Sequence, residues 1–153
     1  MKHILAAIAM IACGSTAAQA AEVKAADDFT AAPDKVWAAI GDFCGIGSWH
    51  PVVAKCELSA DKKTRTLTTQ DGAVLIETQE SWDDAAMTYT YRIQESPLPV
   101  ANYISTIRVV PAGAGSRVEW SSTFDAKGAT DAEAEKVISG IYLAGFGGLK
   151  SKF

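Results

Sequence analysis

The chain has 153 residues, 48% of them hydrophobic and 21% charged, which suits one folded domain and excludes a disordered or fibrous protein. Its formal net charge is −4, and Lys and Arg form no cluster anywhere in the sequence. Nucleic acids and anionic lipid surfaces reward clustered basic side chains, so the composition argues against both as partners.

The first 20 residues have the pattern of a secretory signal peptide. Lys2 precedes an apolar run at residues 4–12, which is too short to span a bilayer. Small residues follow, and residues 18–20 read Ala-Gln-Ala, the A-x-A pattern of a cleavage site. We therefore predict cleavage after Ala20 and export of the protein.

Cleavage would leave residues 21–153, which we predict to form a single domain located in the periplasm or outside the cell. Two other interpretations of the N-terminal segment stay open. One is a buried first helix. The other is lipoprotein processing at Cys13, although Ile11 stands where such a signal prefers a small residue.

Cys44 and Cys56 are the two cysteines that remain after cleavage. An even number of cysteines in an oxidising compartment favours a disulfide. A bridge between them would close a loop of about a dozen residues and contribute about 3 kcal/mol in the chain-entropy model. Two free thiols are the alternative, because spacing alone does not determine pairing.

The first part of the mature chain predicts a strand, a helix and a short helical turn. Residues 22–29 predict a short strand, and Pro33 followed by an acid is typical of a helix start. The apolar face of this helix recurs at helical spacing, at Val36, Ile40 and Phe43. Glycines then end the helix and leave room for one more helical turn.

From residue 52 onward the apolar period changes to two, which is typical of strands with one buried face. Turn signals such as the Asp71-Gly72 pair separate the runs. The predicted strands lie at residues 52–58, 64–69, 73–82, 87–93, 103–109 and 118–124.

A long helix is predicted to end the chain. Thr130 and Glu133 have the spacing of a capping box. The apolar stripe that follows consists of Ala134, Val137, Ile138, Ile141 and Tyr142. Four glycines lie within or just past this stripe, and each interior glycine costs about 1 kcal/mol relative to alanine. Such glycines are expected where another segment packs closely against the helix backbone, or where the helix bends. Fraying at the chain end is the alternative.

This order of elements resembles the START/Bet v 1-like (SRPBCC) superfamily, and within it the polyketide cyclase/dehydrase and lipid-transport group. The local matches are Ala-Pro-Asp-Lys-Val-Trp at 32–37, Gly-Asp-Phe at 41–43, Trp-His-Pro at 49–51, Asp-Gly at 71–72 and Ser-Arg-Val-Glu-Trp at 116–120. The resemblance implies an α+β helix-grip fold, in which a curved antiparallel sheet of seven strands wraps around the C-terminal helix and leaves an apolar pocket. Members share a cavity rather than a catalytic motif.

Two side chains are candidates for acid–base chemistry. His50 is the first, because histidine titrates near neutral pH; a structural role with hydrogen bonds to the backbone is the alternative. Glu80 is the second. It points into the cavity if Val74, Ile76 and Trp82 face inward, where a carboxylate could orient or protonate a ligand. A solvated position at the mouth of the cavity is the alternative.

Strand parity and the helix stripe predict the lining of the pocket, and Trp49, His50 and Glu80 are expected near its mouth. The predicted residues are Trp49, His50, Glu80, Met87, Tyr89, Tyr91, Tyr103, Ile107, Val109, Val118, Trp120, Val137, Ile138 and Ile141. Simple core packing is the alternative for most of them. In the chain that remains after cleavage, one histidine and two cysteines expected to be oxidised fall short of a zinc or copper site, and no phosphate-binding glycine loop occurs, so we predict neither a metal nor a cofactor.

Three functions are compatible with these features. The first is a periplasmic binding or carrier protein for a small hydrophobic molecule. The second is a cyclase or dehydratase that uses the same cavity. The third is an accessory protein that docks on a periplasmic partner enzyme, since some secreted members of the superfamily resemble helpers of methanol oxidation. Because the titratable groups are scattered, we favour binding without catalysis. We also expect a monomer or weak dimer that binds no nucleic acid and does not insert stably into a membrane.

Overall fold

The computed structural model describes residues 20–153. The signal-peptide prediction for residues 1–19, including Cys13, lies outside the described residues. The elements are β1 (Ala21–Phe29), α1 (Pro33–Ile40), α2 (Ile46–Trp49), β2 (Val53–Leu58), β3 (Thr64–Thr69), β4 (Val74–Asp83), β5 (Thr88–Glu95), β6 (Val100–Ala112), β7 (Gly115–Ala126) and α3 (Asp131–Lys150). Every element predicted from the sequence is present, and the largest difference is that β6 and β7 extend further at both ends.

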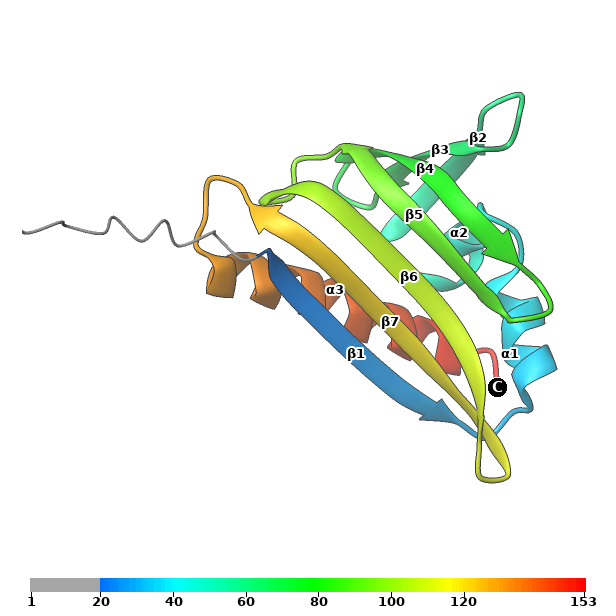
Figure 1. Cartoon of the computed structure of the whole chain (residues 1–153). Helices are drawn as coiled ribbons and strands as arrows, with labels where there is room; N and C mark the ends of the chain where they lie inside the picture. Colours follow the sequence, from blue (N-terminus) through cyan, green and yellow to red (C-terminus); the bar gives the residue numbers. More distant parts are fainter. Residues whose placement is uncertain (1–19) are drawn as a thin grey trace, which may run out of the picture.

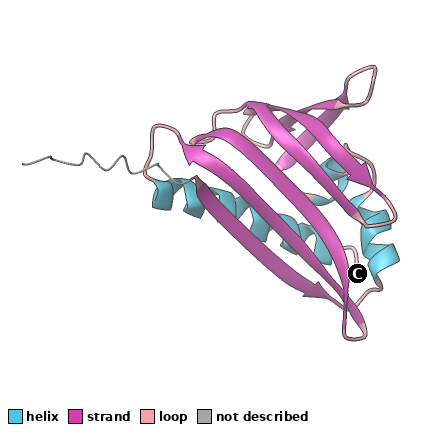
Figure 2. Cartoon of the chain, in the orientation of Figure 1, coloured by secondary structure: helices cyan, strands magenta, loops and turns pink. Residues whose placement is uncertain are grey.

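The strands form one antiparallel sheet in the order β1-β7-β6-β5-β4-β3-β2. The sheet is curved, and the helices gather on one side of it (Figures 1 and 2). The long helix α3 contacts β1 and β7, α1 contacts β6 and β7, and α2 contacts β2. This arrangement is the helix-grip fold that the order of elements predicted.

The disulfide between Cys44 and Cys56 is present, with the two Cα atoms 5.6 Å apart. Cys44 lies in the loop between α1 and α2, and Cys56 lies in β2. The predicted pairing is therefore confirmed, and it attaches the α1–α2 loop to the edge strand of the sheet.

The helix α3 begins with the predicted capping box. The backbone N–H of Glu133 donates to the Thr130 hydroxyl at 3.3 Å, and the Glu133 carboxylate accepts from the backbone N–H of Thr130 at 2.8 Å. Two of its glycines are points of close approach. A Cβ at Gly145 would lie 2.8 Å from the Trp120 ring, and a Cβ at Gly148 would lie 2.0 Å from the carbonyl oxygen of Trp49. These glycines let α3 pack directly on β7 and α2.

Candidate ligand-binding pocket

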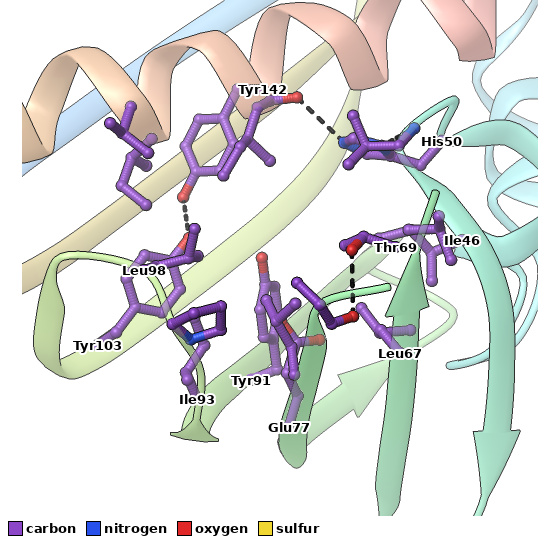
Figure 3. Close-up of a pocket in the computed structure, with 18 of the residues that line it drawn as sticks. Ile46, His50, Leu67, Thr69, Glu77, Tyr91, Ile93, Leu98, Tyr103 and Tyr142 are labelled. Atoms are coloured by element: carbon purple, nitrogen blue, oxygen red, sulfur yellow. Dashed lines mark hydrogen bonds between the residues drawn. The ribbon is translucent and has the colours of Figure 1, made fainter. Parts of the chain in front are cut away.

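A cavity of about 300 Å³ lies between α3 and the strands β2 to β7. Most of its wall is apolar, and the apolar side chains come from both the sheet and the helix (Figure 3). Leu67 on β3, Leu75 on β4 and Ile93 on β5 form part of the sheet side, while Ile138 and Ile141 come from α3. The strands supply these side chains because their period-two pattern directs every second residue toward the concave face.

The structure separates the predicted pocket residues into two groups. Those that line the cavity are His50, Tyr91, Tyr103, Trp120, Val137, Ile138 and Ile141. Those that do not are Trp49, Glu80, Met87, Tyr89, Ile107, Val109 and Val118. The predicted lining did not include several residues that contribute, above all Glu77 and Tyr142, although Tyr142 belongs to the predicted apolar stripe of the helix.

Helix α1 explains why several inward-facing residues lie outside the cavity. Tyr89, Ile107 and Val118 are each 2% exposed or less and belong to the packed core. The α1 residue Trp37 lies 5.1 Å from the ring of Trp82, which in turn stacks on Tyr89 at 4.7 Å. Strand parity indicated the correct face, but α1 and its aromatic cluster fill the end of the sheet that they cover, and the cavity remains only at the other end.

Glu80 does not point into the pocket, contrary to the parity prediction. It lies on the outer face, 41% exposed, where its carboxylate accepts a hydrogen bond from Arg92 at 3.2 Å. The pairing of β4 with β5 contains irregularities between Ile76 and Glu77 and between Gln79 and Ser81. A β-bulge adds one residue and reverses the alternation, so Glu77 faces inward in place of Glu80.

Glu77 forms a buried ion pair with Arg65 on the neighbouring strand. The Arg65 Nε donates to Glu77 Oε2 at 2.6 Å, and the two side chains are 1% and 5% exposed. Arg65 also donates to the carbonyl oxygen of Phe43 at 2.5 Å, and its guanidinium lies over the rings of Phe43 and Tyr91. Burial alone would lower the pKa of Arg65, but the charge of Glu77 raises that pKa above its usual value, so the guanidinium stays protonated. Arg65 and Glu77 have opposite charges and lie on the predicted strands at 64–69 and 73–82, which flank the Asp71-Gly72 turn. This pairing was the signal in the sequence that could have predicted the ion pair.

A chain of buried hydroxyl groups connects the sheet to α3 at the wall of the pocket. The hydroxyl oxygens of Tyr103 and Tyr142 are 2.5 Å apart, and that of Tyr142 is 3.0 Å from Ser105 Oγ. Ser105 donates its own proton to the carbonyl oxygen of Ser121 at 2.9 Å. Burial raises the pKa values of Tyr103 and Tyr142 above the usual range, so both remain protonated near neutral pH.

His50 is bound to the backbone through both ring nitrogens. Its Nε2 lies 3.0 Å from the carbonyl oxygen of Ile141, and its Nδ1 accepts from the backbone N–H of Val52 at 3.3 Å. Since a carbonyl oxygen only accepts, Nε2 carries the proton and the imidazole is neutral. Burial lowers the pKa of His50, and the positive charge of Arg65 lowers it further, against the opposing effect of the Ile141 carbonyl. The geometry matches the structural alternative, in which His50 attaches α3 to the start of β2.

The buried, neutral state of His50 predicts a loss of stability in mild acid. Above the ordinary pKa of 6.5, His50 is neutral in both the folded and the unfolded chain. As the pH falls below 6.5, the unfolded chain binds a proton that the folded chain does not, so the free energy of unfolding decreases, by at most about 1.4 kcal/mol per pH unit. Urea unfolding between pH 7.5 and 5.5 measures this slope. A His50→Gln variant should lack it; an equal slope in both proteins would contradict the assignment.

Two features are absent from residues 20–153, namely a cluster of metal ligands and a helix that could span a membrane. No three His, Cys, Asp or Glu side chains of this part of the chain come together in a way that could hold a metal ion. None of its helices has the length and apolar content needed to cross a bilayer.

Comparison with known proteins places the chain in a family. Residues 20–153 match the family described as polyketide cyclase / dehydrase and lipid transport. No match is found among the curated proteins. The structure of the protein XoxI from Bacillus cereus is 35% identical, with a TM-score of 0.84 over 87% of this chain and 95% of that chain. A protein from Bacillus thuringiensis is 34% identical, with a TM-score of 0.84 over 87% of this chain and 98% of that chain.

A more distant structure shares the fold alone. The Zhui aromatase/cyclase from Streptomyces sp. R1128 is 16% identical, with a TM-score of 0.72 over 87% of this chain and 93% of that chain. From the match over residues 20–153 and the Bacillus relatives, the chain belongs to the polyketide cyclase/dehydrase and lipid transport family.

Proposed function

We propose that this protein is exported to the periplasm and binds a small hydrophobic molecule in its cavity without converting it. The observation that carries the proposal is the cavity of about 300 Å³ with largely apolar walls. An engineered apolar cavity of about 150 Å³ in another protein binds benzene, so this one suits a molecule of about two rings. Burial of apolar surface, worth about 25 cal/mol per Å², would supply most of the affinity.

The state of the titratable groups supports binding rather than catalysis. Both nitrogens of His50 are occupied by backbone groups, so the ring has no free site for proton transfer. The tyrosines at the cavity have raised pKa values, which makes them weak acids at neutral pH. One observation favours an enzyme of the cyclase or dehydratase type as the second candidate: Glu77 brings a carboxylate to the cavity wall.

Export is supported by the segment that precedes the domain and by the disulfide. Residues 1–20 have the order of charge, apolar run and small residues that a signal peptide requires. The bond between Cys44 and Cys56 is of a kind that persists in oxidising compartments such as the periplasm.

Native mass spectrometry of the protein purified from a periplasmic extract of its own source tests the proposal. We expect a mature chain that begins at Ala21 and carries a small molecule that is released unchanged on denaturation. Leu75→Trp should abolish this retention, because Leu75 lines the cavity and a larger ring would fill it. Val74→Trp is the matched control, since Val74 is 48% exposed and does not line the cavity.

Three results would argue against the carrier. A chain that retains its N-terminal segment, or that is absent from the periplasmic extract, would contradict export. Equal retention by the Leu75→Trp and Val74→Trp variants would place the ligand elsewhere. The pure protein can also be supplied with the molecule that it retained. Recovery of a chemically different molecule from that mixture would favour the enzyme.

A further inference from the structure

Two polar groups on the sheet side of the cavity have unused hydrogen-bonding capacity. Glu77 uses Oε2 for Arg65, whereas Oε1 has no partner among the described residues and is not sealed within the protein. Glu77 lines the cavity, so Oε1 is an acceptor that a bound molecule can reach. Tyr91 also lines the cavity, and in Figure 3 both residues lie across the cavity from Tyr142 and His50.

The hydroxyl proton of Tyr91 is the free donor. The buried hydroxyl chain runs in one direction: Ser105 donates to Ser121, so Tyr142 donates to Ser105 and Tyr103 donates to Tyr142. Each of these protons is therefore in use.

Tyr91 differs from the members of that chain. Its oxygen accepts from Trp120 Nε1 at 3.2 Å, and its own O–H finds no acceptor among residues 20–153. Burial holds the pKa of Tyr91 well above its usual value, so the proton stays on the oxygen.

The free acceptor and the free donor belong to neighbouring residues on the inner face of the sheet. Glu77 pairs with Ile93 across β4 and β5, and Gln79 pairs with Tyr91, so Glu77 and Tyr91 are diagonal neighbours. Diagonal neighbours on one face of a sheet are about 7–8 Å apart, within reach of long and aromatic side chains. The Arg65 guanidinium touches both, since its Nε is 2.6 Å from Glu77 Oε2 and its central carbon is 5.0 Å from the Tyr91 ring centre.

The charge balance selects a neutral group rather than a cation. Arg65 already compensates the negative charge of Glu77, and its guanidinium lies directly behind the Tyr91 ring. A ligand ammonium would bring a second positive charge beside Arg65 into an apolar cavity, and an anion would meet Glu77. A ligand hydroxyl can donate to the Glu77 carboxylate and accept from the Tyr91 hydroxyl without bringing another charge into the cavity.

We propose that the cavity binds a neutral two-ring alcohol or phenol, whose hydroxyl donates to Glu77 and accepts from Tyr91 while its rings fill the apolar remainder. The inference rests on the proposed function and names the class of molecule that the same site takes. It makes Glu77 and Tyr91 the residues that determine specificity in an otherwise apolar pocket.

A series of naphthalenes tests the two hydrogen bonds separately. Naphthalene has neither donor nor acceptor, 2-methoxynaphthalene offers only the acceptor for Tyr91, and 2-naphthol offers both. Dissociation constants are measured by isothermal titration calorimetry on the mature, disulfide-bonded protein. We expect 2-methoxynaphthalene to bind about fivefold more tightly than naphthalene, and 2-naphthol about tenfold more tightly again, because its bond is to a charged acceptor. A fourth compound, 2-naphthylmethylammonium, should bind more weakly than 2-naphthol.

Tyr91→Phe removes the free donor and leaves the ion pair intact. Trp120 keeps its second acceptor, Ser105 Oγ at 3.0 Å, so the variant should fold. It should bind naphthalene and 2-methoxynaphthalene with equal affinity. Tyr89→Phe is the matched control: Tyr89 lies two residues earlier on β5, is 1% exposed and does not line the cavity. This control should keep the fivefold step. If Tyr91→Phe fails to fold, the affinities of the naphthalene series for the unaltered protein still test the two hydrogen bonds.

The outcomes separate this inference from the proposed function. Equal affinities for naphthalene and 2-naphthol would overturn the inference and leave the carrier in place. Tightest binding of the ammonium compound would overturn the choice of a neutral group. Absence of saturable binding for all four compounds would overturn both.

Discussion

Replacement of Glu77 by Ala is expected to lower the free energy of unfolding by about 3–5 kcal/mol, because it leaves the Arg65 guanidinium charged and unpaired in the interior. Arg65 is 1% exposed, and an arginine side chain keeps its proton in a protein even without a partner, so it cannot become neutral to escape the cost. One of its nitrogens, Nη2, already has no partner among residues 20–153. Urea unfolding at neutral pH measures the change.

Two controls separate the lost partner from the lost side chain. The double variant Arg65→Met with Glu77→Leu removes both charges, and buried ion pairs replaced by apolar residues of similar size often lose little or no stability. Glu80 lies on the same strand as Glu77 and forms an exposed ion pair with Arg92. Glu80→Ala removes that pair and should lower the free energy of unfolding by less than about 1 kcal/mol. If Glu77→Ala and Glu80→Ala cost the same, Glu77 does not form a buried ion pair.

Adjacent glycines of α3 are expected to respond to alanine with opposite signs. Gly148→Ala should lower the free energy of unfolding by about 3 kcal/mol, because its Cβ would lie 2.0 Å from the backbone oxygen of Trp49 and the helix would have to move. Gly147→Ala should raise it by about 0.5–1 kcal/mol, because nothing lies within 4 Å of the added atom and alanine has the higher helix propensity. Thermal and urea unfolding of the two variants measure both changes.

The pair is its own control, since the substitution, the helix and the distance from the chain end are nearly the same. Changes of the same sign would mean that α3 does not pack against the α2 turn at Gly148. The expected result would also explain why a helix that carries four glycines is stable: at Gly148 the missing side chain permits a contact that a Cβ would block.

The elements of the fold were predictable from the sequence because their signals are local. The alternation from residue 52 onward depends on neighbours two residues apart, the capping box on Thr130 and Glu133, and the hairpin on Asp71-Gly72. Their order was also enough to identify the helix-grip fold and the family. The disulfide followed from the number of cysteines and the inferred compartment.

The content of the cavity was decided by tertiary structure. Irregular pairing of β4 with β5 turned Glu77 inward and Glu80 outward, and one residue of register reverses every side chain that follows. Helix α1 packs on one end of the sheet through Trp37, which contacts Trp82. Tyr89 and Ile107 are therefore part of the packed core and do not line the pocket. Periodicity along one strand determines which residues share a face. Hydrogen-bond register and the volume occupied by a distant helix determine which of those residues meet a ligand, and both depend on contacts between segments far apart in the chain.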